Sequence, residues 1–177
     1  MHASLFNALK ALHAQHQAAV APLAVAELGS LDINGSIRDF IPDLTGFDIV
    51  AGPGVDVVIQ PGAIPPEHQR RYGLVVSTSS FQFCPHPGLY KRQILDLLSA
   101  QGHLFLTMCS DRCQQRHSTS NNEQGFGDSF RMSLAQLRAF FDDAFDCLSI
   151  EELVSATVHP HLDFVYVGRR KAGAASR

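Results

Sequence analysis

The chain has 177 residues, of which 45% are hydrophobic and 18% are charged, and its formal net charge is −3. This length suits one domain of ~150 residues with short extensions, and the composition excludes a disordered or collagen-like chain. The acidic balance, with a single short basic run near residue 170, argues against a nucleic acid as partner.

Neither the cysteines nor the apolar stretches suggest an exported or membrane protein. The four cysteines are too few and too scattered for a disulfide scaffold. No stretch reaches the ~20 apolar residues of a membrane span, and polar residues and Pro22 interrupt the apolar N-terminal segment, unlike a signal peptide. We therefore expect a reduced, cytoplasmic protein that has no membrane partner.

The N-terminal residues have the periodicity of a helix, and the residues after them form short apolar runs. Leu5, Leu9 and Leu12 recur at helical spacing and predict an amphipathic helix over 4–18, within an N-terminal segment of 1–22. Near-continuous apolar runs, bounded by Gly, Pro or polar residues, are typical of a parallel sheet covered by helices on both faces. Such runs predict strands at 23–28, 46–50, 55–59, 73–77 and 103–108.

Helices alternate with only some of these strands. Residues 89–100 and 133–145 each have one apolar side and predict helices, the second with Ser133 as its N-cap, and 66–71 predict a shorter one. Between the second and third strands, Ala51–Gly54 is too short for a crossover helix. The pattern therefore predicts a doubly wound α/β fold in which one crossover helix is reduced to a loop.

The C-terminal part predicts two antiparallel strands, 146–154 and 162–169, joined by a turn near 158–161. We expect one domain over 23–170 and a mobile tail at 171–177. The short link after the second strand also suggests a homodimer, in which a second copy covers the part of the sheet that lacks a helix.

The turn after the first strand is a candidate ligand site, because doubly wound sheets bind ligands at the carboxyl ends of their strands. A dinucleotide fingerprint needs G-x-G-x-x-G, but Leu31 and Asn34 follow Gly29 where the second and third glycines belong. No phosphate-binding G-x-x-x-x-G-K-[ST] loop occurs either. The sequence therefore disfavours a phosphate cradle.

Two acids near this turn favour a different ligand. Glu27 stands two residues before Gly29, where a carboxylate repels a pyrophosphate but holds a cation; the alternative is a simple ion pair with Arg38. Asp48 ends the second strand 19 residues after Gly29, the spacing at which an acid accepts the hydroxyls of a ribose. An adenosine ribose with a positive head group is S-adenosylmethionine.

These segments resemble the class I S-adenosylmethionine-dependent methyltransferase domain. The similarity covers roughly residues 20–170 and is greatest to a compact branch whose first motif has the ELGSLDINGS type and whose second and third strands are joined by a Gly-Pro-Gly loop. The matching segments are Glu27–Ser36, Gly46–Ile49, Gly52–Val58 and Leu74–Thr78. The resemblance implies a Rossmann-like, mostly parallel seven-stranded sheet in the order 3-2-1-4-5-7-6 with an antiparallel C-terminal hairpin.

The resemblance also implies a set of cofactor-binding residues. They are Glu27, Gly29, Ser30, Leu31, Asp48, Ile49, Gly62, Ala63, Ser77 and Thr78. The glycine turn would line the methionine and ribose, Asp48 would bind the ribose hydroxyls, and Ile49 would lie against adenine. The residues after the third strand would lie at the adenine edge, and those after the fourth would face the methyl group and the substrate.

The segment after the fourth strand departs from the family pattern, in which two acids and a histidine often follow. Gln82 and Phe83 stand at the Glu-His positions here. Methyl transfer is an in-line displacement that depends mainly on alignment and exclusion of water, so this loss does not exclude activity. We expect an enzyme that methylates a small molecule or a modest polar acceptor. The alternatives are a degenerate, non-catalytic module that binds the cofactor or a protein partner and, more remotely, a nicotinamide oxidoreductase.

His86 is the candidate general base, because it follows the fourth strand and lies over the expected substrate site. The alternative is a loop histidine held by its flanking prolines. His117 and Asp128 are weaker candidates in the loop 110–128, which could form a lid or a plain connection.

Cys109, Cys113 and His117 have a C-x3-C-x3-H spacing that could hold a metal ion. Structural zinc usually takes four ligands, often from two closely spaced pairs, and no second pair occurs. We therefore expect no metal site.

Overall fold

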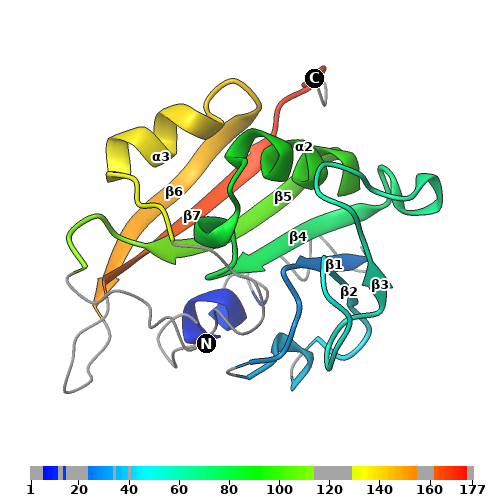
Figure 1. Cartoon of the computed structure of the whole chain (residues 1–177). Helices are drawn as coiled ribbons and strands as arrows, with labels where there is room; N and C mark the ends of the chain where they lie inside the picture. Colours follow the sequence, from blue (N-terminus) through cyan, green and yellow to red (C-terminus); the bar gives the residue numbers. More distant parts are fainter. Residues whose placement is uncertain are drawn as a thin grey trace.

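A computed structural model describes residues 6–11, 14, 24–33, 35–39, 41–113, 129–154 and 162–174. One seven-stranded sheet runs through the molecule in the order β3-β2-β1-β4-β5-β7-β6 (Figure 1), which confirms the predicted order. The strands are β1 Val25–Leu28, β2 Thr45–Asp48, β3 Val57–Val58, β4 Tyr72–Thr78, β5 Leu98–Cys109, β6 Phe145–Val154 and β7 Leu162–Arg170.

The strand order reverses direction between β1 and β4: β2 and β3 follow β1 on one side, and β4 and β5 lie on the other. Strands β1 to β5 pair in parallel, whereas β7 pairs antiparallel with both β5 and β6, which confirms the predicted C-terminal hairpin. Glu27 of β1 is level with Gly46 of β2 on one side and Val76 of β4 on the other. The carboxyl ends of these strands therefore meet at the switch point where such sheets bind ligands.

Apolar side chains form a core on each face of the sheet. Helices α2 (Pro87–Leu97) and α3 (Leu134–Phe141) lie together on one face (Figure 1) and cover the larger core, which includes Val75. The smaller core includes Val76 and Leu9, the latter from the helical residues 6–11. Successive strand residues point to opposite faces, so continuous apolar strands fill both cores.

The connections in the β1–β4 half are shorter than a typical doubly wound fold requires. The β2–β3 connection, residues 49–56, contains no helix, as predicted. The reduction extends further, because the described parts of the β1–β2 and β3–β4 connections contain only single 3-10 turns, η1 (Ile37–Asp39) and η2 (Pro66–His68). Loops therefore shape this half of the ligand edge.

The predicted helix over 89–100 is wrong at its C-terminal end. Helix α2 ends at Leu97, and Leu98 already pairs with Tyr72 of β4. Leu98 is completely buried, so pairing and burial override a sequence that also suits a helix. Helix α3 begins after Ser133, whose side chain and that of Gln136 form a capping box, which confirms the predicted N-cap.

Several predicted features lie partly or wholly outside the described residues. The predicted 4–18 helix is described, as helix, at 6–11 and 14, while the turn near 158–161 and the loop 114–128 fall outside. At the predicted tail, the Lys171 amide donates to the Ala144 carbonyl, and 175–177 are not described. Within the described part of the chain, no helix is long and apolar enough to cross a membrane.

Candidate functional site

Two buried acids lie at the carboxyl ends of adjacent strands. Glu27 is the next-to-last residue of β1 and is 5% exposed; Asp48 is the last residue of β2 and is 7% exposed. Neighbouring strands are about 4.8 Å apart, so the two carboxyl groups belong to one site. Burying two acids together is unfavourable unless other groups compensate them.

Glu27 is poised between its charged and neutral forms. Burial raises the pKa of its carboxyl to about 7, while the nearby Arg38 charge lowers the pKa and Asp32 raises it. Thr78, at the end of β4, hydrogen-bonds to the same carboxyl. The Arg38 guanidinium itself pairs with Asp56, so the Glu27–Arg38 ion pair considered from the sequence is a longer-range interaction.

Asp48 anchors the surrounding loops through its carboxylate. Its Oδ1 accepts the Ile49 amide at 2.7 Å and the Val50 amide at 3.3 Å, and its Oδ2 accepts the Leu31 amide at 3.1 Å. A carboxylate has about four acceptor sites, so these contacts leave one on Oδ2. Beside it, the Ile49 side chain is half exposed and offers an apolar surface.

The glycine turn is compact because the segment after β4 packs against it. Gly29 has φ +82°, and a Cβ added there would lie 1.9 Å from Ser80 Oγ. Only glycine combines this left-handed backbone with such a close approach. Next to it, the buried Ser30 hydroxyl has no hydrogen-bond partner among the described residues, which suits a ligand contact.

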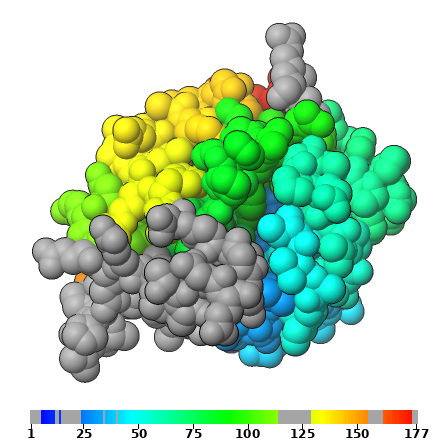
Figure 2. All heavy atoms as spheres, viewed as in Figure 1, coloured from blue at the N-terminus to red at the C-terminus, as the bar shows by residue number. Residues whose placement is uncertain are grey.

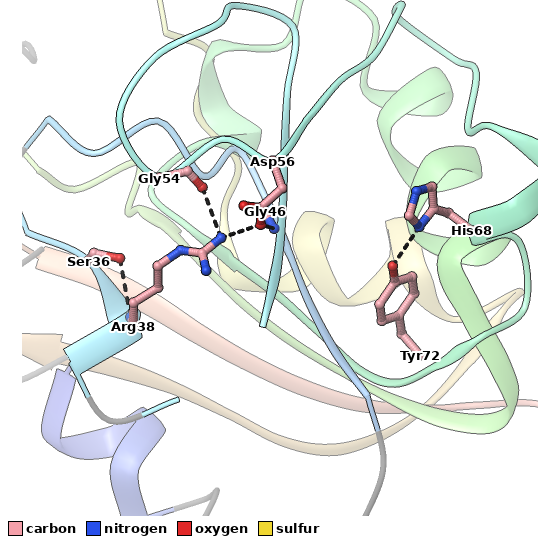
Figure 3. Close-up of polar contacts among 7 residues, drawn as sticks. All are labelled: Ser36, Arg38, Gly46, Gly54, Asp56, His68 and Tyr72. Carbon is pink, nitrogen blue, oxygen red and sulfur yellow. Dashed lines mark hydrogen bonds and ion pairs between the residues drawn. The ribbon is translucent and has the colours of Figure 1, made fainter. Parts of the chain in front are cut away.

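The Gly-Pro-Gly loop closes over the turn in place of a helix. A Cβ on Gly46 would lie 2.1 Å from the Gly54 carbonyl oxygen and 2.6 Å from Ser30 Oγ, so the contact requires glycine. Arg38 donates to Gly54 O at 3.4 Å and pairs with Asp56, whose Oδ2 also accepts the Gly46 amide at 2.7 Å (Figure 3). This network ties the β2–β3 loop to β2 and to η1.

The remaining predicted cofactor residues have mixed surroundings. Gly62, with φ +77°, packs against Leu89 of α2. Figure 2 shows the green surface around α2 next to the teal surface of the segment between β2 and β4. Ala63 is exposed, and the Ser77 hydroxyl is bonded to Tyr90. The contacts thus join the glycine turn, Asp48 and the end of β4, while the adenine-edge roles of Gly62 and Ala63 remain predictions.

The candidate base His86 is exposed and is the residue before α2. Its carbonyl accepts the Leu89 amide at 2.9 Å, and its side chain makes no capping hydrogen bond. This placement leaves the imidazole accessible, and its catalytic role remains a prediction. His117 and Asp128 lie outside the described residues.

The cysteines of the considered metal site lie together. Cys109 and Cys113 are both buried. Burial raises the pKa of the Cys109 thiol to about 12, and a hydrogen bond with Cys113 contributes to the increase as the second-largest cause. His117 is not described, and among the residues that are, no three potential ligands gather.

Sequence reasoning does not predict the contacts of three residues near the site, one of which, Gln82, it notes only as a departure from the family pattern. Tyr90 and Ser80 contact the glycine turn, and Gln82 is fully buried with its Oε1 accepting the Cys109 amide at 2.6 Å. Their only sequence signal is position: two follow the fourth strand and one lies in the next helix. Nothing local indicates that their side chains turn inward.

Comparisons with known proteins identify the architecture. No protein-family model and no curated protein sequence matches this chain. Among solved structures, it is similar to the 1,6-didemethyltoxoflavin-N1-methyltransferase of Burkholderia thailandensis, crystallised with 1,6-didemethyltoxoflavin and S-adenosylhomocysteine. The TM-score is 0.72 at 14% identity, over 97% of this chain and 80% of the other. The chain has the fold of S-adenosylmethionine-dependent methyltransferases.

Two further methyltransferase structures show the same fold. The enzyme from Anabaena variabilis has a TM-score of 0.60 at 14% identity, over 91% of this chain and 84% of the other. The enzyme from Mesorhizobium loti has a TM-score of 0.58 at 13% identity, over 89% of this chain and 97% of the other. The similarity therefore extends over nearly the whole domain.

Proposed function

We propose that the chain binds S-adenosylmethionine at the carboxyl ends of β1, β2 and β4 and transfers its methyl group to a small-molecule or modest polar acceptor. The observation that carries this proposal is the pair of buried acids, Glu27 and Asp48, beside the left-handed Gly29 at the switch point of a methyltransferase fold. Asp48 also anchors the loop amides, but one acceptor site on its Oδ2 is left for a ligand.

The described residues fit the polar groups of this cofactor. The remaining acceptor site on Asp48 Oδ2 suits a ribose hydroxyl, and Ile49 offers an apolar surface to adenine. Ionised Glu27 suits the amino group of the methionine part, and the buried Ser30 hydroxyl, which has no partner among the described residues, is free to bind a polar group of the cofactor.

The residues of this chain would act mainly by alignment. S-adenosylmethionine supplies a methyl group on a sulfonium, which leaves as a neutral thioether. Thr78, half-buried at the end of β4, would bound the space in which the acceptor approaches. The Ser77 hydroxyl beside it is fully buried and bonded to Tyr90, so Ser77 would support this edge from inside the fold. Where the acceptor must lose a proton, the exposed His86 is the proposed base.

One observation favours a second candidate, a non-catalytic module that binds the cofactor or a protein partner. Gln82 stands where the family often has an acid, and its side chain is committed to the Cys109 amide inside the fold. The Oε1 of this residue therefore supports β5, while its buried Nε2 has no hydrogen-bond partner among the described residues. Such a module would keep the two acids that bind the cofactor but would lack residues that act on an acceptor.

The substitution Asp48→Asn tests the binding site. Asparagine keeps one oxygen for the Ile49 and Val50 amides but replaces the Oδ2 acceptor, so affinity for S-adenosylhomocysteine should fall roughly tenfold or more, about 1–3 kcal/mol. Asp43→Asn, at an exposed loop position, is the matched control and should bind like the wild type. Equal calorimetric affinities for the two variants would remove Asp48 from the site.

A further inference from the structure

A single phenol joins three elements next to the glycine turn. Tyr90, in the first turns of α2, is 7% exposed, and its hydroxyl donates to the carbonyl of Leu28, the last residue of β1, at 2.9 Å. The Ser77 hydroxyl of β4 lies 2.8 Å from the same phenol oxygen. A phenol has one proton, so with that proton on Leu28 the serine must be the donor in the second bond.

The peptide between Leu28 and Gly29 is held at both of its polar groups. Tyr90 binds its carbonyl, while its N–H donates to the Phe47 carbonyl of β2 at 2.8 Å. The plane of this peptide, and with it the φ of +82° at Gly29, is therefore set by α2 on one side and β2 on the other. Without the phenol hydroxyl, the buried carbonyl would lose its donor and the peptide could rotate.

The chain after β4 completes this arrangement. Ser79 has φ +53°, and its amide bonds to the Thr107 carbonyl of β5 at 3.1 Å. The turn places Ser80 against Gly29, where an added Cβ would lie 1.9 Å from Ser80 Oγ and 3.3 Å from the Tyr90 hydroxyl. Tyr90 therefore lies where the cofactor turn and the acceptor-side segment meet.

We propose that Tyr90 is a positioning residue: its hydroxyl orients the Leu28–Gly29 peptide and so holds the glycine turn in the conformation that adenosyl binding requires. Tyr90 acts through the turn rather than by touching the cofactor. The orienting role stands on the fold alone, whereas its effect on affinity rests on the proposed function.

The test compares Tyr90→Phe with Tyr72→Phe. Tyr72 is also buried, and its hydroxyl makes one hydrogen bond of 2.8 Å, to His68 Nδ1, in a place separate from Gly46 and Gly54 (Figure 3). Both variants lose one buried hydroxyl, but the Tyr90 hydroxyl bonds Leu28, Ser77 and Ser80 whereas the Tyr72 hydroxyl bonds His68, so Tyr90→Phe should lose more stability. Within each variant, exchange at the Gly29 and Ser30 amides is therefore measured relative to exchange at the core amide of Val75. We expect only Tyr90→Phe to speed hydrogen exchange at the Gly29 and Ser30 amides, and only Tyr90→Phe to weaken S-adenosylhomocysteine binding, each by roughly tenfold.

The two readouts separate the two claims. Unchanged exchange at Gly29 and Ser30 in folded Tyr90→Phe would overturn the orienting role, and faster exchange with unchanged affinity would overturn its link to binding. A wild type that does not bind S-adenosylhomocysteine would refute the proposed function, while the exchange data would still decide the orienting role. If Tyr90→Phe does not fold in buffer, the same exchange comparison is made with sucrose present to stabilise both variants, and unchanged exchange at Gly29 and Ser30 there would overturn the orienting role. Ser77→Ala removes one of the two serine hydroxyls that bond the phenol, the other being Ser80, and should speed the same amides more weakly.

Discussion

The carboxyl group of Glu27 binds its proton more tightly in the folded chain than in the unfolded one. Burial raises its pKa from about 4.5 to about 7, despite the nearby Arg38 charge and the Thr78 hydrogen bond, both of which lower the pKa. The folded state therefore holds more protons between these two values. By linkage, this group makes the fold less stable as the pH rises from about 4.5 through about 7.

Glu27→Gln tests this linkage. Glutamine resembles the protonated acid in shape and stays neutral, so the variant should have a larger free energy of unfolding than the wild type at pH 8, by up to about 3 kcal/mol. The difference should vanish near pH 4.5. Urea unfolding of both proteins at the two pH values measures it.

The comparison between the wild type and Glu27→Gln also cancels the contribution of a second acid to the pH dependence of stability. Burial raises the pKa of Asp163 to about 6, so this acid adds a pH dependence of the same sign to both proteins. Only the difference between the two proteins reports on Glu27. Equal stabilities at pH 8 would show that the Glu27 carboxyl is not buried as described.

At the scale of single residues, the sequence predicts the charged residues of the candidate site better than the residues that hold them in place. Glu27 and Asp48 are visible from their spacing to Gly29, because a ligand site at strand ends constrains where acids stand. The role of Tyr90 cannot be predicted from the sequence, because a tyrosine in an amphipathic helix is ordinarily a core residue. Only the structure shows that its hydroxyl reaches the carbonyl of Leu28.

At the scale of elements, a loop replaces the helix between β2 and β3. The loop is held by the Arg38–Asp56 pair and by backbone contacts, including the Asp32 amide to the Pro53 carbonyl at 2.9 Å. Polar bonds to the backbone thus substitute for the packing that a crossover helix would provide. These bonds can form only because Gly46 has no side chain, which lets the Gly54 carbonyl come close to it.

Gly46→Ala tests the importance of that approach. The new methyl group would lie 2.1 Å from a backbone oxygen of Gly54, so the loop must move. We expect a loss of about 1–3 kcal/mol in the free energy of unfolding, together with weaker S-adenosylhomocysteine binding. Chemical denaturation and calorimetry measure the two effects.

Gly88→Ala is the matched control, because a Cβ there would meet no atom within 4 Å. Gly88 lies in α2, where alanine is favoured over glycine, so this variant should be as stable as the wild type or slightly more stable. Equal losses for the two variants would contradict a special role for the loop over Gly46.

Across the whole molecule, the sheet is more predictable than its connections. Continuous apolar runs reveal strands because both faces are buried, and the resemblance supplies their order. Helix ends and 3-10 turns depend on contacts distant in sequence, as Leu98 illustrates by joining β5 through its pairing with Tyr72. The absence of a helix between β2 and β3 was predictable from chain length. The reduction of the other two connections to 3-10 turns was not, since residues 66–71 also suit a short helix and the structure has only η2 there.

The central claim is that this edge of the sheet binds an adenosyl cofactor through its two acids. Calorimetric titration of the wild-type chain with S-adenosylmethionine and S-adenosylhomocysteine at pH 6 and pH 8, with NAD as control, tests it most directly. The account predicts binding of both adenosyl compounds and not of NAD. Affinity should be about tenfold weaker at pH 6, because Glu27, with a pKa of about 7, must lose a proton to hold the ligand's amino group. Absence of binding at both pH values would contradict it.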